Sequence, residues 1–576
     1  MPRTRPAVVF SLCALFLLSA AQAGAAPESV VADVPGDDWS LPAWVTPSSN
    51  SGFFSEASSP GFNVNVRVAD FTWRQLQPTQ GSFSQTTGDS VYGMTFPSWD
   101  TQLAGSDPIW LRLWVSGADW APQWVKTLCG VSAVGTGYEG DDHLPIWNAC
   151  FWQQARELFR QVLVVHGLRS DPRLKFVYVP GGFTWCEFDY DIPTQAAENF
   201  GLTFATFDGW FQPAMQHLVD ILNGENADPT DDYSSKLVFT GEDYPFGPWD
   251  TLDDLHARDA VAKGMGIRTG ITEVFNFHLN HVPAYGTTIA ADGHMTTDEN
   301  WRGLDGRRVV ATENECFNDC GFTVADTAYA VKMANLKALQ LRMNWIYVVP
   351  GPSYMATYPE LWSWTRLELG KRIYEAPDAW AALREAEDTY WIDDTSHTWN
   401  GAPWVKNLER WLRQNDVAPD GIVRRGTDVR ANEPTPENGI AYEGLRTQLS
   451  LGRSAIYLDL EERFFAGGVV DAGGVEVKVT YRDSGTGSFR IDYPTASGVT
   501  STAPQAYTNT GGWRTATFSL PDALWNDSLA GGNDLRLAAT GPADLEVRFV
   551  RVVRLARPKA IFLDAFESGT SGFWSP

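Results

Sequence analysis

The strongest constraint on the fold is an alternation of short apolar runs with amphipathic stretches between residues 52 and 350. This alternation is typical of strand–helix units that build a parallel sheet. Two of the intervening stretches, 152–167 and 325–342, carry apolar side chains at helical spacing, and the first ends at Gly167, a normal helix stop. The predicted strands are 62–68, 109–115, 174–180, 236–241, 266–271, 307–313 and 344–350, with a weaker eighth run at 51–57.

Eight such units in this length predict a (β/α)8 TIM barrel. The alternative is an open doubly wound sheet, which normally carries a Gly-rich phosphate loop after its first strand. The chain contains neither GxGxxG nor GxxxxGK[ST]. The barrel is therefore favoured, and we assign it to residues 24–395.

The pattern changes in the last third of the chain. Runs such as 475–481, 487–493 and 545–555 alternate apolar with polar residues, and Gly-, Asp- and Ser-rich turns separate them. This predicts an antiparallel β-sandwich over 451–556, joined to the barrel by an irregular connecting segment at 396–450. The tail, 557–576, resembles a short C-terminal signature common on exported proteobacterial proteins.

The first 23 residues have the features of a secretory signal peptide. Arg3 and Arg5 precede an apolar run, and Ala21-Gln22-Ala23 provides a small-residue cleavage site. A membrane anchor is the alternative, but the run is shorter than the ~20 residues that a bilayer requires. The mature protein is therefore predicted to be secreted or periplasmic, without a membrane span.

Five cysteines remain after cleavage, and export would place them in an oxidising compartment. We expect disulfides between Cys129 and Cys150 and between Cys316 and Cys320. Cys186 is left over. We interpret it as a buried free thiol rather than a nucleophile, because no His lies near it in sequence.

Charge and composition restrict the classes of molecule that the protein is expected to bind. Lys plus Arg number 44 against 70 Asp plus Glu, a net charge of -26, which disfavours nucleic acid and anionic membranes. Aromatic residues reach 13%, with 25 Trp. Flat rings stack on the C–H faces of sugars, so a neutral carbohydrate is a suitable partner.

In a barrel, the side chains at the carboxyl ends of the strands line the active site. Those ends are rich in carboxylates and aromatic rings here and poor in His. The chain has no HExxH and no G-x-S-x-G, which disfavours zinc and serine esterase chemistry. We therefore expect neither a metal nor a cofactor.

Two carboxyl groups among aromatic rings suit hydrolysis of a glycosidic bond, in which one donates a proton and the other attacks the sugar. Glu187, in "VPGGFTWCEFD", lies beside Phe183, Trp185 and Phe188 and suits the acid. Glu313, in "VVATENECF", ends a predicted strand. Glu315 has the same strand parity, so both could face the barrel axis.

Four motifs, in the expected order, resemble those of the retaining (β/α)8-barrel glycoside hydrolase superfamily, in its uncharacterised beta-galactosidase-like branch. "VRVADFTWRQLQPTQGSFS" resembles the second-strand signature, and "WAPQWV" an element after the third strand. "DPRLKFVYVPGGFTWCEF" resembles the fourth-strand segment, and "RRVVATENE" the seventh strand. The resemblance covers residues 45–390 and implies Glu187 as general acid/base and Glu313 as nucleophile.

The sequence departs from that superfamily at Cys186, where Asn usually precedes the acid/base and hydrogen-bonds the sugar. Glu315 is the alternative nucleophile. Arg67 and Arg112, within apolar runs, would either hold a carboxylate or brace the core. The expected substrate-binding residues are Arg67, Trp73, Arg112, Trp114, Trp185, Asn276, Glu315 and Tyr347.

The sequence thus predicts a secreted glycoside hydrolase that cleaves O-glycosidic bonds of a neutral oligo- or polysaccharide. The alternatives are a catalytically inactive carbohydrate-binding pseudoenzyme, which Cys186 favours, and a surface adhesion protein in which the sandwich binds the ligand.

Overall fold

The computed structural model describes residues 30–558. Residues outside the description within that range are 57–63, 138, 181, 189, 226–228, 241–254, 270–285, 291–293, 298–307, 315–326, 350–353, 384, 388–397, 400–401, 404–406, 426–439, 443 and 466–473. The predicted signal peptide and most of the C-terminal tail therefore lie outside the described residues.

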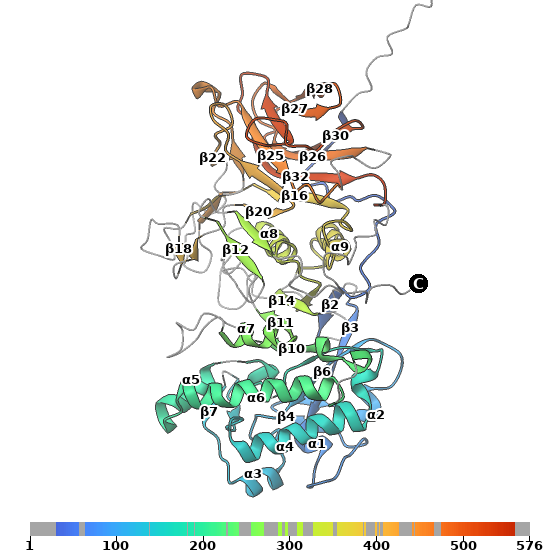
Figure 1. Cartoon of the computed structure of the whole chain (residues 1–576), viewed down its shortest axis with the longest axis vertical. Coiled ribbons are helices and arrows are strands. Elements are labelled where there is room, and N and C mark those ends of the chain that lie inside the picture. Colours follow the sequence, from blue (N-terminus) through green and yellow to red (C-terminus); the bar gives the residue numbers. More distant parts are fainter. Residues whose placement is uncertain are drawn as a thin grey trace, which may run out of the picture.

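Eight parallel strands close into a barrel, as the sequence predicted (Figure 1). Their order around the barrel follows the chain, so that the last strand, β15, pairs with the first, β2. The strands are β2 (Gly52–Ser55), β3 (Val66–Thr72), β6 (Ile109–Trp114), β9 (Leu174–Tyr178), β10 (Leu237–Thr240), β11 (Gly266–Thr269), β14 (Val310–Asn314) and β15 (Trp345–Val348).

The second barrel strand lies four residues later than predicted. The run 62–68 was expected, but β3 spans Val66–Thr72, and Arg67 is aligned with Ile109 at the start of β6. The polar residue Asp70, in the middle of β3, concealed this extension, because it interrupts an otherwise apolar pattern. Consequently Asp70, and not Arg67, lies toward the carboxyl end of the strand.

Helices accompany the strands in the described part of the barrel. Predicted helix 152–167 is observed as α4 (Ala149–Arg160) followed by one π-helical turn (Gln161–Val165), and 325–342 as α8 (Thr327–Gln340). The other described helices are α1 (Trp73–Leu76), α2 (Trp99–Gln102), α3 (Gln123–Cys129), α5 (Asp191–Phe200), α6 (Phe204–Leu222), α7 (Leu255–Ala262) and α9 (Pro359–Glu368). Short hairpins are β4 (Asp89–Val91) with β5 (Met94–Phe96), β7 (Gly135–Thr136) with β8 (Asp142–His143), and β12 (Thr287–Ile289) with β13 (Met295–Thr297).

Two antiparallel sheets form a β-sandwich around a second apolar core. One sheet has the order β1-β30-β26-β32-β16-β20, and the other β21-β25-β31-β27-β28. Their strands are β1 (Val30–Pro35), β16 (Asp378–Ala382), β20 (Leu408–Arg410), β21 (Leu412–Asn415), β25 (Ala455–Leu460), β26 (Val475–Arg482), β27 (Ser488–Thr495), β28 (Gly498–Ser501), β30 (Trp513–Leu520), β31 (Leu535–Ala539) and β32 (Glu546–Arg554). Shorter strands at their margins are β22 (Arg424–Arg425), β24 (Leu445–Arg446) and β29 (Gln505–Ala506), and separate pairs are β17 (Glu385–Glu387) with β23 (Ile440–Tyr442) and β18 (Thr398–Trp399) with β19 (Ala402–Pro403).

The sandwich draws strands from outside the predicted range 451–556. β1 lies at the start of the described residues and pairs with β30, while β16 comes from the predicted barrel segment and pairs with β32. Each covers what would otherwise be an unpaired sheet edge. β1 and β16 are short and lie far in sequence from the strands they pair with, so the sequence gives no local signal of this pairing.

Buried charges connect the sandwich to the barrel. Helices α8 and α9 lie against the strands β16 and β20 (Figure 1). Arg410 of β20 donates to Glu368 of α9 at 2.7 Å, and both side chains are nearly inaccessible to water. Trp364 of α9 also donates to Asp378 of β16 at 3.3 Å. The Arg410–Glu368 pair holds the two parts in one orientation, because separating them would leave uncompensated charge.

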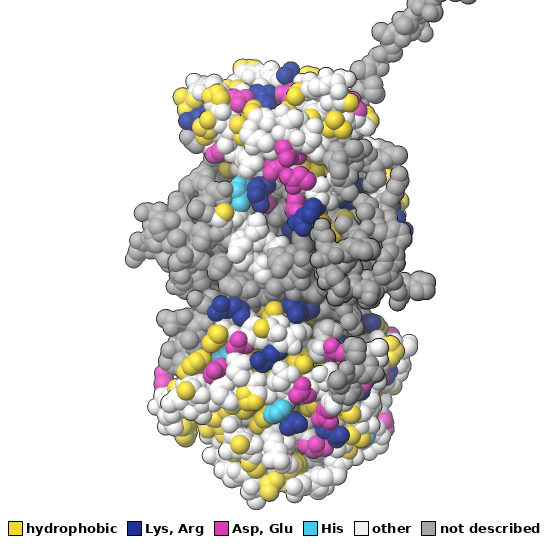
Figure 2. Space-filling view, viewed as in Figure 1, with side chains coloured by type: hydrophobic (Ala, Val, Ile, Leu, Met, Phe, Trp, Pro, Cys, Tyr) yellow, Lys and Arg dark blue, Asp and Glu magenta, His cyan; other side chains and the backbone are white. Residues whose placement is uncertain are grey.

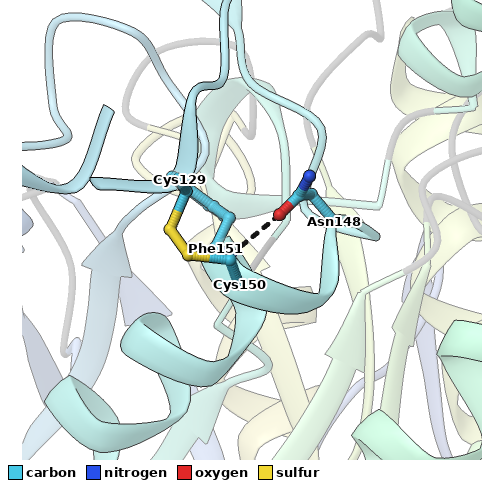
Figure 3. Close-up of a disulfide and its surroundings, with 4 residues drawn as sticks. All are labelled: Cys129, Asn148, Cys150 and Phe151. Carbon is cyan, nitrogen blue, oxygen red and sulfur yellow. Dashed lines mark hydrogen bonds between the residues drawn. A yellow bond between two sulfur atoms is a disulfide. The ribbon is translucent and has the colours of Figure 1, made fainter. Parts of the chain in front are cut away.

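A disulfide joins Cys129, at the end of α3, to Cys150, at the start of α4 (Figure 3), which confirms that predicted pair. The side chain of Asn148 accepts a hydrogen bond from Phe151 at 3.1 Å and caps α4. The disulfide and the cap together fix the loop that follows the third barrel strand. Cys316 and Cys320 lie outside the described residues, and Cys186 is a buried free thiol.

The surface carries charge of both signs. On the face shown in Figure 2, acidic and basic side chains are interspersed over the described residues, without a broad basic stripe. Among the described residues, no helix has both the length and the apolar character that a bilayer crossing requires.

One carboxylate of the sandwich predicts a pH-dependent stability. Burial, reinforced by the charge of Asp534, raises the pKa of Asp459 to about 6. Because the folded-state pKa lies above the unfolded value, this contribution to stability is complete below pH 4 and is lost as the pH rises through 6. Asp459→Asn should therefore raise Tm at pH 7.5 by about 2–4 °C, for a half-buried group contributing about 1 kcal/mol, and leave Tm unchanged at pH 4. Thermal unfolding in metal-free buffer measures this, and an equal effect at both pH values would contradict it.

Candidate active site

Glu187 and Glu313 meet inside the barrel at one arginine. Glu313 is in β14, Glu187 is in the loop after β9, and each is 4% exposed. Arg268 of β11 lies between them: its Nη2 donates to Oε1 of Glu313 at 2.9 Å and to Oε1 of Glu187. Residues far apart in the chain therefore share a single buried nitrogen.

This shared donor limits the separation of the two carboxylates. Two oxygens hydrogen-bonded to one nitrogen lie at most about 6 Å apart, since such bonds reach about 3.2 Å. Arg268 itself is 1% exposed. The site is thus a buried arrangement of two carboxylates and one permanent positive charge.

The loop that carries Glu187 follows an unusual path. Trp185 and Cys186 both have left-handed backbone, with φ of 58° and 62°. Gly182 lies directly under this turn, because a Cβ there would be 2.4 Å from the carbonyl carbon of Cys186 and 2.8 Å from the amide nitrogen of Glu187. Strain of this kind is maintained only where the surroundings impose it.

A buried hydrogen-bond chain provides such surroundings. Ser116, after β6, donates to the carbonyl of Gly182 at 2.7 Å and lies 3.0 Å from Nδ1 of His143. Nε2 of His143 lies 2.6 Å from Oδ2 of Asp141. All three side chains are nearly inaccessible. We interpret the chain as a brace between the loops that follow the third and fourth strands, since a nucleophile would need access to substrate.

A second buried arginine lies beside this loop. Arg112 of β6 contacts Asp70 with two hydrogen bonds of 2.7 Å and also donates to Glu56. Although burial alone would lower it, the pKa of Arg112 is held well above its ordinary value by Asp70 and Glu56. Trp114 donates to the same Asp70 at 3.0 Å. Arg112 therefore holds carboxylates, one of the two roles that the sequence left open.

Aromatic rings enclose both arginines. Arg268 lies 5.4 Å from the ring of Tyr347 and 5.7 Å from that of Tyr178, and Arg112 lies 5.9 Å from that of Trp185. Burial raises the pKa of Tyr178 well above its ordinary value, so its hydroxyl stays protonated. Burial likewise raises the pKa of Cys186, which keeps its sulfur a neutral thiol and a poor nucleophile.

The structure places the predicted residues in three groups. Arg112, Trp114, Trp185 and Tyr347 surround the carboxylate pair or its loop. Arg67 and Trp73 do not join them. Asn276 and Glu315 lie outside the described residues.

Two expected positions need correction. Arg67 begins β3, donates to the carbonyl of Gln102 and lies 3.9 Å from Asp107, at the opposite end of the barrel strands from Glu313. The reason is that β3 lies four residues later than predicted. Trp73 is fully buried at the start of α1, where its ring packs on Phe151 of α4, because this position faces the helix layer.

Sequence reasoning missed Arg268, Asp70 and Glu56. Arg268 is an arginine inside the apolar run of a predicted strand, the same signal that selected Arg67 and Arg112. Asp70 was hidden by the misplaced strand, and Glu56 lies within the weakest predicted run, 51–57, directly after the observed β2. Among the described residues, the three carboxylates close enough to share a metal ion, Asp459, Asp527 and Asp534, lie in the sandwich and not in this site.

Comparisons with solved structures gave the following distant similarities. No family model matches the chain, and no curated protein matches it. A solved isomalto-dextranase from Arthrobacter globiformis T6, in complex with panose, is 11% identical with a TM-score of 0.31, covering 90% of this chain and 100% of its own. An unliganded structure described as BiXyn10A CBM1 is 12% identical with a TM-score of 0.15, covering 24% of this chain and 96% of its own. Similarities this weak say nothing about the activity of this chain.

Proposed function

We propose that the protein is an exported glycoside hydrolase that cleaves O-glycosidic bonds of a neutral oligo- or polysaccharide with retention of configuration. Glu187 is the general acid/base and Glu313 the nucleophile. The observation that carries the proposal is the pair of buried carboxylates held on Arg268. The net charge of -26 supports a neutral substrate, since polyanions would be repelled.

The separation of the carboxylates favours retention over inversion. Retaining enzymes place the two groups about 5–5.5 Å apart, whereas inverting enzymes need about 6.5–9.5 Å to admit a water. Oxygens that share one nitrogen are too close together for the longer separation, which supports retention. Glu187 would protonate the leaving oxygen while Glu313 attacks the anomeric carbon. Water activated by Glu187 would then hydrolyse the glycosyl ester.

Arg268 fits the charge changes of this mechanism. Before attack, Glu313 is ionised and Glu187 carries the proton, so the pair has one negative charge. After attack, Glu313 is an ester and Glu187 has lost its proton, so the pair again has one negative charge. An arginine in contact with both groups is compensated at each stage without moving. Such preorganisation lowers barriers because no dipole must reorient.

The first test is a search for turnover. The full mature chain would be incubated with an aryl-glycoside panel and with neutral polysaccharides, and released sugar measured, with the anomer of the first product followed by NMR. Release with retained configuration is expected. Binding of glycans without any release would support the pseudoenzyme, and inversion would contradict the assigned role of Glu313.

A second test concerns the loop that carries Glu187. Gly182→Ala should lower kcat on any substrate of the wild type by about 10²-fold, because the new Cβ would displace Cys186 and Glu187, and a shift of about 1 Å costs this much. Steady-state kinetics would measure it.

Gly209, in helix α6, is the matched control, because a Cβ there meets nothing within 4 Å. Gly209→Ala should leave kcat unchanged and raise stability slightly, since alanine favours helix. If both glycine variants retain full activity, the position of the loop does not limit turnover.

A further inference from the structure

An aromatic side chain at the rim of the barrel is exposed to solvent and is also held in place by a hydrogen bond. Tyr92 is at the tip of the hairpin formed by β4 and β5, in the segment that follows the second barrel strand, and 47% of it is exposed. Its hydroxyl donates to Oδ2 of Asp119, in the loop after the third strand, at 2.8 Å. The ring is therefore fixed between two loops while remaining open to solvent.

The backbone at this tip is specialised. Tyr92 and Gly93 have φ of 51° and 79°, the pair of positive values that a two-residue hairpin turn requires. Asn, Asp and Gly normally occupy the first of these positions, and a bulky residue there is an outlier. A strained conformation that presents an aromatic ring points to a function of the ring.

The hairpin is anchored to the region of the candidate active site. Asp89, at its base, accepts from Arg74 at 2.8 Å and from Thr72, the last residue of β3, at 2.6 Å. Phe96 contacts Trp114 edge to face at 5.4 Å, and Trp114 in turn contacts Trp185 at 5.7 Å.

The inner face of the hairpin joins one apolar cluster with Cys186, the neighbour of Glu187. The exposed ring and the catalytic loop are thus supported by the same packed group. A substrate that reached both would have to extend across the rim.

We infer that Tyr92 and Asp119 form a sugar-binding subsite away from the cleavage point, so that the substrate is a chain of several neutral sugars and not a small glycoside. This inference rests on the proposed function. The ring would stack on the C–H face of a sugar, and the carboxylate of Asp119 would accept hydrogen bonds from its hydroxyls. Burial and the bond to Asp119 raise the pKa of Tyr92 to about 12, so the phenol remains neutral.

Affinity electrophoresis of the full chain tests this subsite. Glu313→Gln would be run in native gels that contain soluble starch, dextran, β-glucan, galactomannan or galactan. At least one polysaccharide should retard it. Adding Tyr92→Ala should raise the Kd for that polysaccharide about 3- to 10-fold, the effect of losing one aromatic contact. Tyr92→Phe, which keeps the ring and loses the bond to Asp119, should have a smaller effect.

Phe200, an aromatic residue that is 64% exposed at the end of α5, provides the matched control. Adding Phe200→Ala should leave the retardation unchanged. The inference is overturned if no polysaccharide retards the protein, or if Tyr92→Ala and Phe200→Ala behave alike.

Kinetics separate this inference from the proposed function. In the active chain, Tyr92→Ala should lower kcat/KM more as the oligosaccharide becomes longer. Retardation without any turnover would contradict the proposed hydrolase activity and support the subsite. Turnover that Tyr92→Ala lowers equally for short and long substrates would support the hydrolase activity and contradict the subsite.

Discussion

Glu313→Ala is expected to abolish turnover of an aryl glycoside, by ~10⁴-fold or more, because no group would remain to form the covalent intermediate. Glu187→Ala should reduce kcat by ~10²–10⁴-fold for a substrate with a poor leaving group, and far less for one that leaves without protonation. Initial rates on a series of aryl leaving groups would measure the difference. The two carboxylates touch the same arginine, so only chemistry distinguishes them.

Added azide separates the two roles more sharply. In Glu313→Ala, azide would occupy the space of the missing carboxylate, attack the sugar directly and give a glycosyl azide of inverted configuration. In Glu187→Ala, azide would instead attack the intermediate on Glu313 and give a product of retained configuration. If the products are exchanged between the variants, the roles of Glu187 and Glu313 are exchanged as well.

The control for this experiment is Glu157→Ala. Glu157 is on the surface of α4, with about half of its side chain exposed, and should tolerate loss of its carboxylate without an effect on rate. Thermal unfolding of all variants would show that they fold. If azide gives the inverted product with Glu315→Ala and does not rescue Glu313→Ala, Glu315 is the nucleophile.

The barrel was predictable because each strand is a local signal. A buried parallel strand is a short continuous apolar run, and seven such runs stood out between amphipathic stretches. One of the seven was misplaced: β3 contains Asp70 and Arg67 within seven residues, so its polar positions broke the run and shifted the predicted strand to 62–68. Because of that displacement, Arg67 was predicted at the carboxyl end of the strand, whereas it lies at the start of β3. Polar residues that a barrel strand carries for an active site therefore weaken the apolar pattern by which that strand is predicted.

The candidate site was only partly predictable, for a related reason. Glu187 lies in the loop after one predicted strand and Glu313 ends another, and both belong to recognisable motifs, so each could be selected by itself. Their contact through Arg268 depends on strand register: Arg268 aligns with Thr240 on one side and Ala311 on the other. Register is a relation between paired strands, so it cannot be read from the sequence of one strand alone. The same holds for the contact of Ser116 with His143 and its neighbour Asp141, because Ser116 lies on a different segment.

Arg268→Met should damage both stability and activity. It would leave two carboxylates, each 4% exposed, without their shared counter-charge, and removing one partner of a buried ion pair costs about 3–5 kcal/mol. On a substrate that the wild type cleaves, kcat should fall ~10²-fold or more, since a preorganised donor to the reacting groups is lost. Chemical denaturation and steady-state kinetics would measure the two effects. Loss of stability should shrink as the pH falls, because protonation removes the uncompensated charge.

A combined variant distinguishes electrostatics from simple packing. In Arg268→Met with Glu187→Gln and Glu313→Gln, all three charges are replaced by neutral side chains of similar size. If charge is the cause, the triple variant should recover most of the stability that Arg268→Met loses, as replaced buried ion pairs commonly do. If the cause is a cavity or a misplaced strand, the triple variant should be no more stable than Arg268→Met. That second result would remove Arg268 as the counter-charge of the pair, and with it the physical reason for assigning one shared negative charge to Glu187 and Glu313 throughout the reaction.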